Sequence, residues 1–195
     1  MTRLIAFFGL LILSVSTMNA QSKSTNFKKG DVQLTASVGL LPTFVADRGH
    51  TNIPPISLKA AFYVSKKFSL EAYTAFSSTE TGVQTYPDHS VNQTKNDFLI
   101  LGSRGVVHTY KYKNWDIYGG LMLGYNIPMV KSTTTYPEGP VKEGELQPTF
   151  HREATNNFTY SGFVGATYFV KKNLGITGEV GYGISIINVG ISYKL

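Results

Sequence analysis

Apolar and polar residues alternate along most of the chain from Gly30 onward. In DVQLTASVGL (31–40), every second residue from Val32 to Leu40 is apolar, and the residues between them are polar or small. A period of two is typical of a β-strand with one apolar face. The pattern recurs and predicts eight strands, within residues 31–40, 56–64, 68–76, 98–109, 115–125, 158–170, 174–182 and 186–195.

The connections between these strands alternate in length. Short ones lie at 65–67, 111–113 and 171–173, with another brief one near 183–185. The others are long, at 45–55, about 77–96 and about 127–156. Short turns at one end and long loops at the other are typical of bacterial outer-membrane barrels. The chain is therefore predicted to be all-β: an eight-stranded antiparallel up-and-down transmembrane β-barrel over residues 30–195, with short periplasmic turns and long extracellular loops.

The connection at 127–156 is rich in β-forming residues at both ends. Its arms are KSTTTY (131–136) and PTFHRE (148–153), and its centre is rich in Pro and Gly. We expect the arms to extend as a hairpin beyond the membrane, with an exposed tip that external protease cuts near Lys142.

Charged residues within the strands share the polar face of the alternation. An Arg or Lys at mid-depth on a lipid-facing surface would cost ~2–4 kcal/mol, so this face is predicted to line the lumen. The short turns would set Gly165 opposite Glu179 and Ala61 opposite Glu71, which leaves room for partners of both carboxylates. We expect Arg104 and Lys59 to be those partners. The predicted lumen charge network comprises Lys59, Glu71, Arg104, His108, Asp116 and Glu179, and Lys194 falls on the same face.

Two further expectations concern the lumen. His108 is expected to bond to Asp116 or to a tyrosine. An eight-stranded barrel is only wide enough for its own side chains to fill it. The lumen is therefore predicted to be narrow and filled.

Aromatic residues of the apolar face gather toward the strand ends. This is the arrangement expected of two aromatic girdles at the membrane interfaces. The predicted girdle residues are Phe68, Trp115, Tyr168 and Tyr193 near the short turns, and Tyr125, Tyr160 and Tyr182, with Phe44 and Phe76, near the long loops.

The first twenty residues, MTRLIAFFGLLILSVSTMNA, have the layout of a secretory signal peptide. Arg3 precedes an apolar stretch from Leu4 to Leu13, and small and polar residues follow up to Ala20. The stretch is shorter than the ~20 residues that a membrane helix needs. We expect cleavage near Ala20–Gln21, export, and a short periplasmic segment at 21–29 before the barrel.

Composition agrees with an exported β protein. The chain has 42% hydrophobic and 13% aromatic residues, only 15% charged residues, 19 glycines and no cysteine. The absence of cysteine excludes disulfides and a lipid anchor through cysteine. The net charge of +6 is spread along the chain in short groups, with no basic stripe of the kind that binds nucleic acid.

Several segments resemble the small outer-membrane β-barrel proteins of the OmpA/OmpX type. They are GSRGVVHTY (102–110), WDIYGGLMLGYN (115–126), GATYFVKKNLGITGEVGYG (165–183) and INVGISYKL (187–195). The resemblance implies insertion into the outer membrane by the barrel-insertion machinery, contact with its lipid, and a structural or adhesive role. It implies no cofactor, and we expect a monomer with a possible protein or host-surface ligand at the loops. The chain ends on Leu195 where such proteins commonly end on an aromatic residue, with Tyr193 two positions earlier.

Two other functions fit parts of the pattern. Loop residues could form a lipid-modifying site at the outer rim, or a metal site: Asp47, His50, Asp88, His89, Ser90, His151 and Glu153. No fixed spacing ties them together, and we expect no enzyme and no metal. A secreted lipocalin-like barrel would instead turn the apolar face inward around a ligand.

Overall fold

The computed structural model describes residues 27–43, 50–81, 83–85, 91–109, 114–135 and 155–195. The predicted signal peptide, its cleavage site and residues 21–26 lie outside this part of the chain. The described residues contain no helix that is long and apolar enough to cross a membrane.

Nine strands make up the sheet. They are β1 (Val32–Gly39), β2 (His50–Tyr63), β3 (Phe68–Glu80), β4 (Gln84–Thr85), β5 (Val91–Thr109), β6 (Trp115–Thr135), β7 (Asn157–Phe169), β8 (Leu174–Gly181) and β9 (Ile187–Lys194). All pairings are antiparallel, and β4 is a two-residue strand that pairs only with β5. The other eight form the closed barrel predicted from the sequence.

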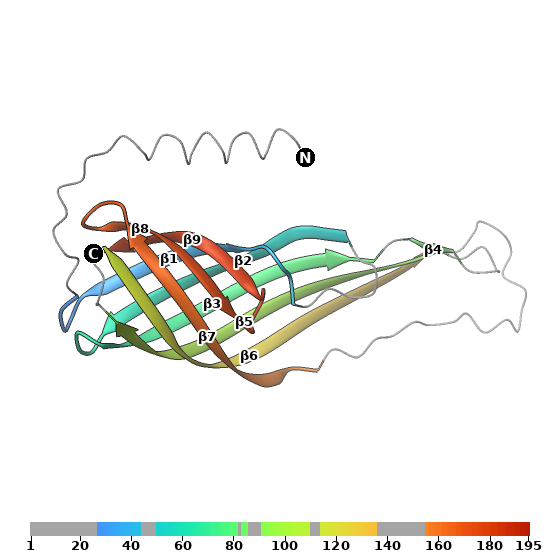
Figure 1. The fold of residues 1–195 in the computed structure, drawn as a ribbon. Helices are drawn as coiled ribbons and strands as arrows, with labels where there is room; N and C mark the ends of the chain where they lie inside the picture. Colours follow the sequence, from blue (N-terminus) through green and yellow to red (C-terminus); the bar gives the residue numbers. More distant parts are fainter. Residues whose placement is uncertain (1–26, 44–49, 82, 86–90, 110–113, 136–154) are drawn as a thin grey trace, which may run out of the picture.

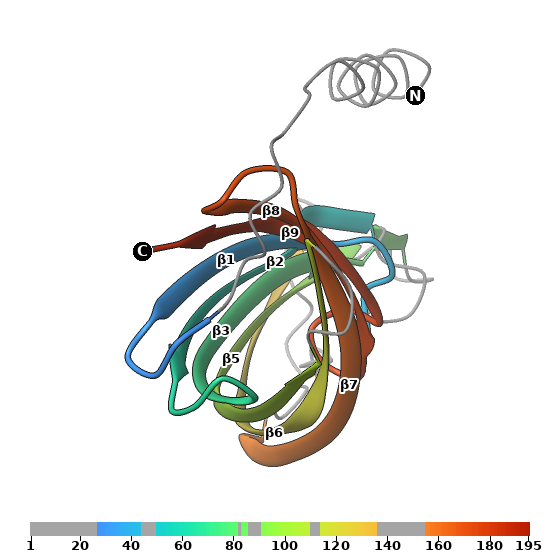
Figure 2. The ribbon, with the colours of Figure 1, turned by 60° about the vertical axis from the view of Figure 1, so that its left-hand side comes forward.

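Closure depends on one pairing that joins distant parts of the chain. β1 pairs with β9, which brings the first and last strands together, and the pairing of β3 with β5 completes the ring. Figures 1 and 2 show the strands tilted around a common axis, with the C-terminus at the end that carries the short turns. Closure leaves the eight barrel strands without a free edge over their shared length.

The predicted registers at the two short turns are confirmed. Gly165 lies opposite Glu179 in the β7–β8 pair, and Ala61 lies opposite Glu71 in the β2–β3 pair. Because the side-chain period is two, each correct pair also places its neighbours on the same faces.

Four strands extend well beyond their alternating segments. β2 begins at His50, within the expected connection at 45–55, β3 continues to Glu80, β5 begins at Val91 and β6 continues to Thr135. Residues 131–135, in the first arm of the expected hairpin at 127–156, are strand and pair with residues 91–95 of β5. Continuing the β5–β6 ladder satisfies backbone N–H and C=O groups on that edge of β6. The second arm, 148–153, lies outside the described residues, so the hairpin itself stays a prediction. The rest of that connection, 136–154 with Lys142, lies outside the described residues.

The barrel is apolar outside and polar inside. Outward side chains such as Leu121 and Val164 are 73% and 64% exposed, whereas Arg104 and Asp116 are each only 2% exposed. A water-soluble barrel of the lipocalin kind would have the opposite distribution, because burial of apolar surface drives its folding. The structure therefore contradicts the lipocalin-like alternative and fits a barrel whose exterior contacts lipid.

Candidate functional site

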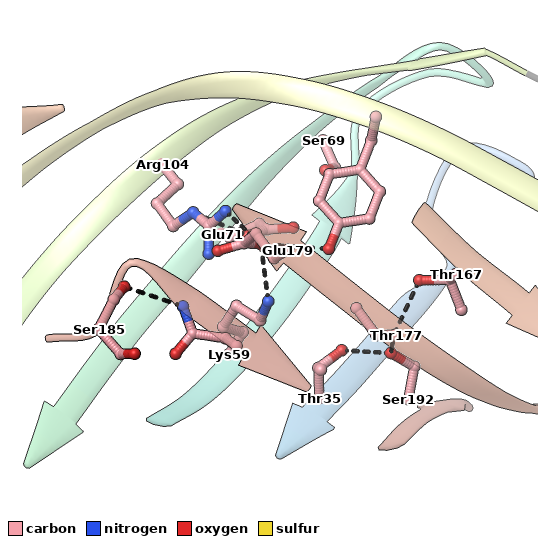
Figure 3. A network of polar contacts seen from close by, with 12 residues as sticks. Thr35, Lys59, Ser69, Glu71, Arg104, Thr167, Thr177, Glu179, Ser185 and Ser192 are labelled. Carbon is pink, nitrogen blue, oxygen red and sulfur yellow. Dashed lines mark hydrogen bonds and ion pairs between the residues drawn. The ribbon is translucent and has the colours of Figure 1, made fainter. Parts of the chain in front are cut away.

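The centre of the lumen holds four charged side chains from four strands. Lys59 Nζ on β2 and Arg104 Nη2 on β5 lie 2.9 Å and 2.8 Å from the same oxygen, Oε2 of Glu179 on β8. Arg104 Nε lies 3.3 Å from Glu71 Oε2 on β3, close enough for an ion pair but without hydrogen-bond alignment. Figure 3 shows these side chains pointing toward one another. Two cations and two anions make the cluster formally neutral, which limits the cost of burying them.

Aromatic rings cover the faces of the Arg104 guanidinium. Its central carbon lies 3.4 Å from the ring centre of Phe163 and 5.5 Å from that of Tyr73. A cation over an aromatic face is attracted by the ring quadrupole, and the attraction strengthens where water is excluded. Arg104 is thus held by ion pairs at its edge and by rings at its faces.

A glycine makes room for a further donor to Glu179. The Tyr118 hydroxyl on β6 donates a hydrogen bond of 3.1 Å to Glu179 Oε2. The facing residue on β7 is Gly165, and a Cβ there would stand 2.5 Å from Cζ of Tyr118. The missing side chain at position 165 therefore lets the phenol reach the carboxylate.

Replacing Gly165 by alanine should displace the Tyr118 ring and lower the free energy of unfolding by ~1–3 kcal/mol, the usual cost of overpacking. The matched control is Gly178→Ala, because a Cβ at Gly178 meets nothing within 4 Å. Both variants can be compared by urea unfolding in lipid vesicles. If Gly165→Ala is as stable as Gly178→Ala, Tyr118 does not depend on the gap.

A chain of hydroxyl groups fills the lumen between the charged cluster and the short-turn end. Thr35 bonds to Ser192 at 2.7 Å, Ser192 to Thr177 at 2.5 Å, and Thr177 to Thr167 at 2.8 Å. Figure 3 shows this chain beside the charged cluster. Each hydroxyl can donate and accept, so the chain satisfies polar groups that the closed wall removes from water.

His108 joins side chains of three strands near the short turns. Its Nδ1 lies 2.9 Å from Asp116 Oδ2 on β6, and its Nε2 lies 2.8 Å from Ser69 Oγ on β3. Ser69 is fully buried, and the other two residues are nearly so. The sequence patterns placed Ser69 on the inward face but assigned it no role.

The short-turn mouth carries an ion pair outside the strand-lined centre. Lys194 Nζ lies 2.6 Å from Asp31 Oδ2, and the backbone N–H of Lys28 donates to the same oxygen at 2.9 Å. Burial alone would raise the pKa of Asp31, but its hydrogen bonds to Lys194 and Lys28 lower that pKa below its ordinary value. The pair is therefore kept at neutral pH and lost only as acid protonates Asp31.

Phe27 closes the same mouth. Its ring is 1% exposed and stacks on Tyr63 with ring centres 4.0 Å apart, and it meets Phe169 edge-on at 5.7 Å. Phe27 belongs to the segment 21–29 that is expected to lie in the periplasm, and its ring packs into the barrel mouth at the short-turn end. No alternating pattern surrounds Phe27, so the sequence carried no signal for its position.

Seven of the nine aromatic residues expected in the girdles are exposed on the exterior. Phe76 is half-buried, and Phe44 lies outside the described residues. Trp115 and Tyr168 face each other across β6 and β7 with rings 5.0 Å apart, near the short turns. Tyr125 meets Phe158 at 5.1 Å toward the other end, and Phe158 was missing from the expected set. At ~3.3 Å per residue and a tilt of ~40°, the segment from Trp115 to Tyr125 rises by roughly 25 Å, the height of the apolar band in such barrels.

The rim candidates do not form a site among the described residues. His50 is exposed and pairs with Glu80 across β2 and β3. The other candidates, Asp47, Asp88, His89, Ser90, His151 and Glu153, lie outside the described residues. Within the part of the chain that the structure describes, no group of His, Cys, Asp or Glu could hold a metal ion.

Comparison with known proteins gives structural matches only. No protein-family model and no curated protein sequence matches the chain. Its structure is similar to the outer membrane protein OprG from Pseudomonas aeruginosa, with a TM-score of 0.53, 12% identity, and coverage of 89% of this chain and 99% of OprG. A designed transmembrane β-barrel matches with a TM-score of 0.47, 16% identity and coverage of 87% and 99%. The outer membrane protein Ail of Yersinia pestis matches with a TM-score of 0.44, 13% identity and coverage of 85% and 99%.

The OprG match and the exterior lead to the same conclusion. OprG shares the fold over nearly its whole length. The apolar band with aromatic residues at both ends is the exterior that a bilayer requires. This chain has the fold of a small eight-stranded outer-membrane β-barrel, with an exterior suited to span a bilayer.

Proposed function

We propose that the barrel has a structural and surface-interaction role, in which extracellular loops bind a protein or a host-surface ligand while side chains fill the narrow lumen. The observation that supports it best is the extension of β5 and β6 past the apolar band. β6 continues ten residues beyond Tyr125, to Thr135, and stays paired with β5 over that whole length. Figure 1 shows the two strands running well past the rest of the barrel, toward β4.

The extension is polar and internally braced. Ser132 donates to Asn92 at 2.9 Å and bonds to Thr94 at 3.2 Å, so side chains link β5 to β6 across the ladder. Lys95 and Lys131 face each other in the pair and give the ribbon exposed positive charge. A paired ribbon that holds its shape loses less conformational entropy on binding than a free loop, which favours an interaction surface.

The remaining parts of the proposal follow from the fold. The partners are outer-membrane lipid around the apolar band, the barrel-insertion machinery during assembly, and the loop ligand. We propose a monomer, because the closed barrel completes its own hydrogen-bond ladder. We also propose that the protein works without a cofactor. The loops are assigned binding and no chemistry.

Labelling of single cysteines in intact cells tests the sidedness on which this role depends. The native chain has no cysteine, so Thr133→Cys on the ribbon and Lys66→Cys in a short turn each provide one thiol. We expect a membrane-impermeant maleimide to label the cysteine at 133 in intact cells. The cysteine at 66 should react only after lysis, since short turns face the periplasm.

Labelling of position 66 but not of position 133 in intact cells would reverse the orientation and remove the surface role. Protection of both would mean that the ribbon is covered or absent from the surface. Whole-cell antibody staining of an epitope tag is no substitute, because an inserted tag changes the loop itself.

A further inference from the structure

Ser69, His108 and Asp116 make an ordered chain of hydrogen bonds at the short-turn end of the lumen. Ser69 lies at the start of β3, His108 near the end of β5 and Asp116 near the start of β6. Ser69 Oγ is 2.8 Å from His108 Nε2, and His108 Nδ1 is 2.9 Å from Asp116 Oδ2 and 3.1 Å from Oδ1. Strand pairing holds all three backbones, so the order serine, histidine, carboxylate is built into the wall.

This order has a chemical consequence. A carboxylate only accepts hydrogen bonds, so Asp116 requires a hydrogen on Nδ1 of His108. In the neutral ring, Nε2 then presents its lone pair to the Ser69 hydroxyl, and it can take the hydroxyl proton as the oxygen attacks. The same contacts would also form if their only role were to give three buried polar groups hydrogen-bond partners. The two explanations differ in whether Ser69 is reactive once a reagent reaches it.

Phe27 packs beside this group at the short-turn mouth. Its ring centre lies 6.5 Å from that of His108, and Tyr63, on which it stacks, lies 4.9 Å from His108. Tyr63 and Phe169 belong to barrel strands, whereas Phe27 precedes β1 and belongs to none. Phe27 can therefore leave without breaking a strand pairing.

A glycine turn and an ion pair hold the segment around Phe27 in place. Gly30 has φ +92°, a conformation that side chains other than glycine rarely adopt, and it turns the chain from Phe27 into β1. The Asp31 carboxylate holds the turn through the N–H of Lys28 and the ammonium of Lys194. Lys194 Nζ also lies 4.6 Å from the Phe27 ring centre, so this one side chain contacts both Asp31 and Phe27.

We propose that Ser69 is an activated serine nucleophile, with His108 as its base and Asp116 as the residue that positions the base, and that Phe27 caps this site at the short-turn end. The structure describes the capped, closed state. The site would take a small ester or phosphonate with an aromatic or short aliphatic group, because the space that Phe27 vacates is bounded by Tyr63 and Phe169. This reactivity goes beyond the binding role proposed above and does not depend on it.

The acyl-transfer step balances with the residues present. Ser69 Oγ forms a bond to the carbonyl carbon of the ester, and its proton moves to His108 Nε2. The ester C–O bond breaks, and the leaving oxygen departs with the bonding electron pair. An alcohol leaving group takes the proton from Nε2, whereas a nitrophenolate departs as the anion. Water attacking by the same route would then release the acid from Ser69.

The test uses the full-length protein folded in detergent and a fluorophosphonate probe, with labelled Ser69 identified by peptide mass spectrometry. We expect the probe to label Ser69 in Phe27→Ala and not in the wild type over the same time. Adding His108→Asn to Phe27→Ala should slow labelling by ~10²-fold or more, the usual contribution of a general base. Adding Ser69→Ala should abolish it. Phe27→Leu is the milder opening variant if Phe27→Ala fails to fold.

A matched access control decides between the outcomes. Ser69→Cys is made in the Phe27→Ala background and treated with a small maleimide. A cysteine that reacts where the native serine is not labelled would show an open but unactivated site and overturn the proposal. A cysteine that does not react would show that Phe27 is not the cap and would overturn it as well. Labelling of Ser69 that survives His108→Asn unchanged would remove His108 as the base.

Discussion

Replacing Arg104 by methionine should lower the free energy of unfolding by about 3–5 kcal/mol, the typical cost of leaving buried charge uncompensated. Arg104 is the cation that contacts both Glu71 and Glu179, and its side chain is only 1% exposed. Without it, Lys59 is the one cation left in the cluster beside two buried carboxylates. The loss should be visible by urea unfolding in lipid vesicles, and the variant should still insert, because its exterior is unchanged.

A control variant and a double variant distinguish the loss of this buried cation from the loss of a positive charge elsewhere on the protein. Lys95→Met removes a cation from an exposed ion pair with Asp97, whose atoms are 3.6 Å apart, and should change stability by less than ~1 kcal/mol. Arg104→Met combined with Glu179→Gln should cost less than the sum of the two single variants, because each removes the partner whose absence makes the other costly. Arg104→Met as stable as Lys95→Met would exclude a cooperative charge cluster.

An arginine at Leu121 should destabilise the protein by ~2–4 kcal/mol in a bilayer, the range for that residue at mid-depth on the lipid face of a barrel. Leu121 lies on β6 about midway between Trp115 and Tyr125, and its side chain is 73% exposed. The guanidinium would have to leave the hydrocarbon by stretching toward an interface. Urea unfolding in vesicles of defined thickness measures this cost, and thinner bilayers should reduce it.

The control for Leu121→Arg lies on the same strand. Thr133→Arg introduces the same side chain on the exposed ribbon, beyond the apolar band, and should change stability by no more than ~0.5 kcal/mol. In a water-soluble barrel Leu121→Arg would be neutral or would improve solubility, because the position would face water. Equal stabilities of the two variants in vesicles would therefore contradict the assignment of the exterior to lipid.

The strands could be predicted from the sequence because the bilayer and the lumen impose opposite demands on alternate residues. Each of the eight alternating segments coincides with or lies within one barrel strand, to within a residue at each end. The start of β2 and the ends of β3, β5 and β6 on the long-loop side were missed. Residues 91–97 and 129–135 lie beyond the apolar band, where neither face contacts lipid, so apolar and polar residues hardly alternate there. They are strands because the β5–β6 ladder continues through them.

The candidate site was partly readable for the same reason. The alternation of apolar and polar residues along each strand placed Arg104 and Glu179 on the inward face. Contacts such as that of Lys59 with Glu179, 120 residues apart in sequence, follow from barrel curvature and have no local signal. Ser69 was one of many inward polar residues, and only its position beside His108 distinguishes it.

Local chemistry along the chain thus specified which segments are strands and which face of each meets lipid, because side chains alternate between faces wherever the backbone is extended. The closed structure alone decided the partners of the lumen charges, the pairing of 131–135 with β5, and the place of Phe27. Those contacts depend on strand tilt and on closure through the β1–β9 pair, which brings together residues that no short stretch of sequence relates.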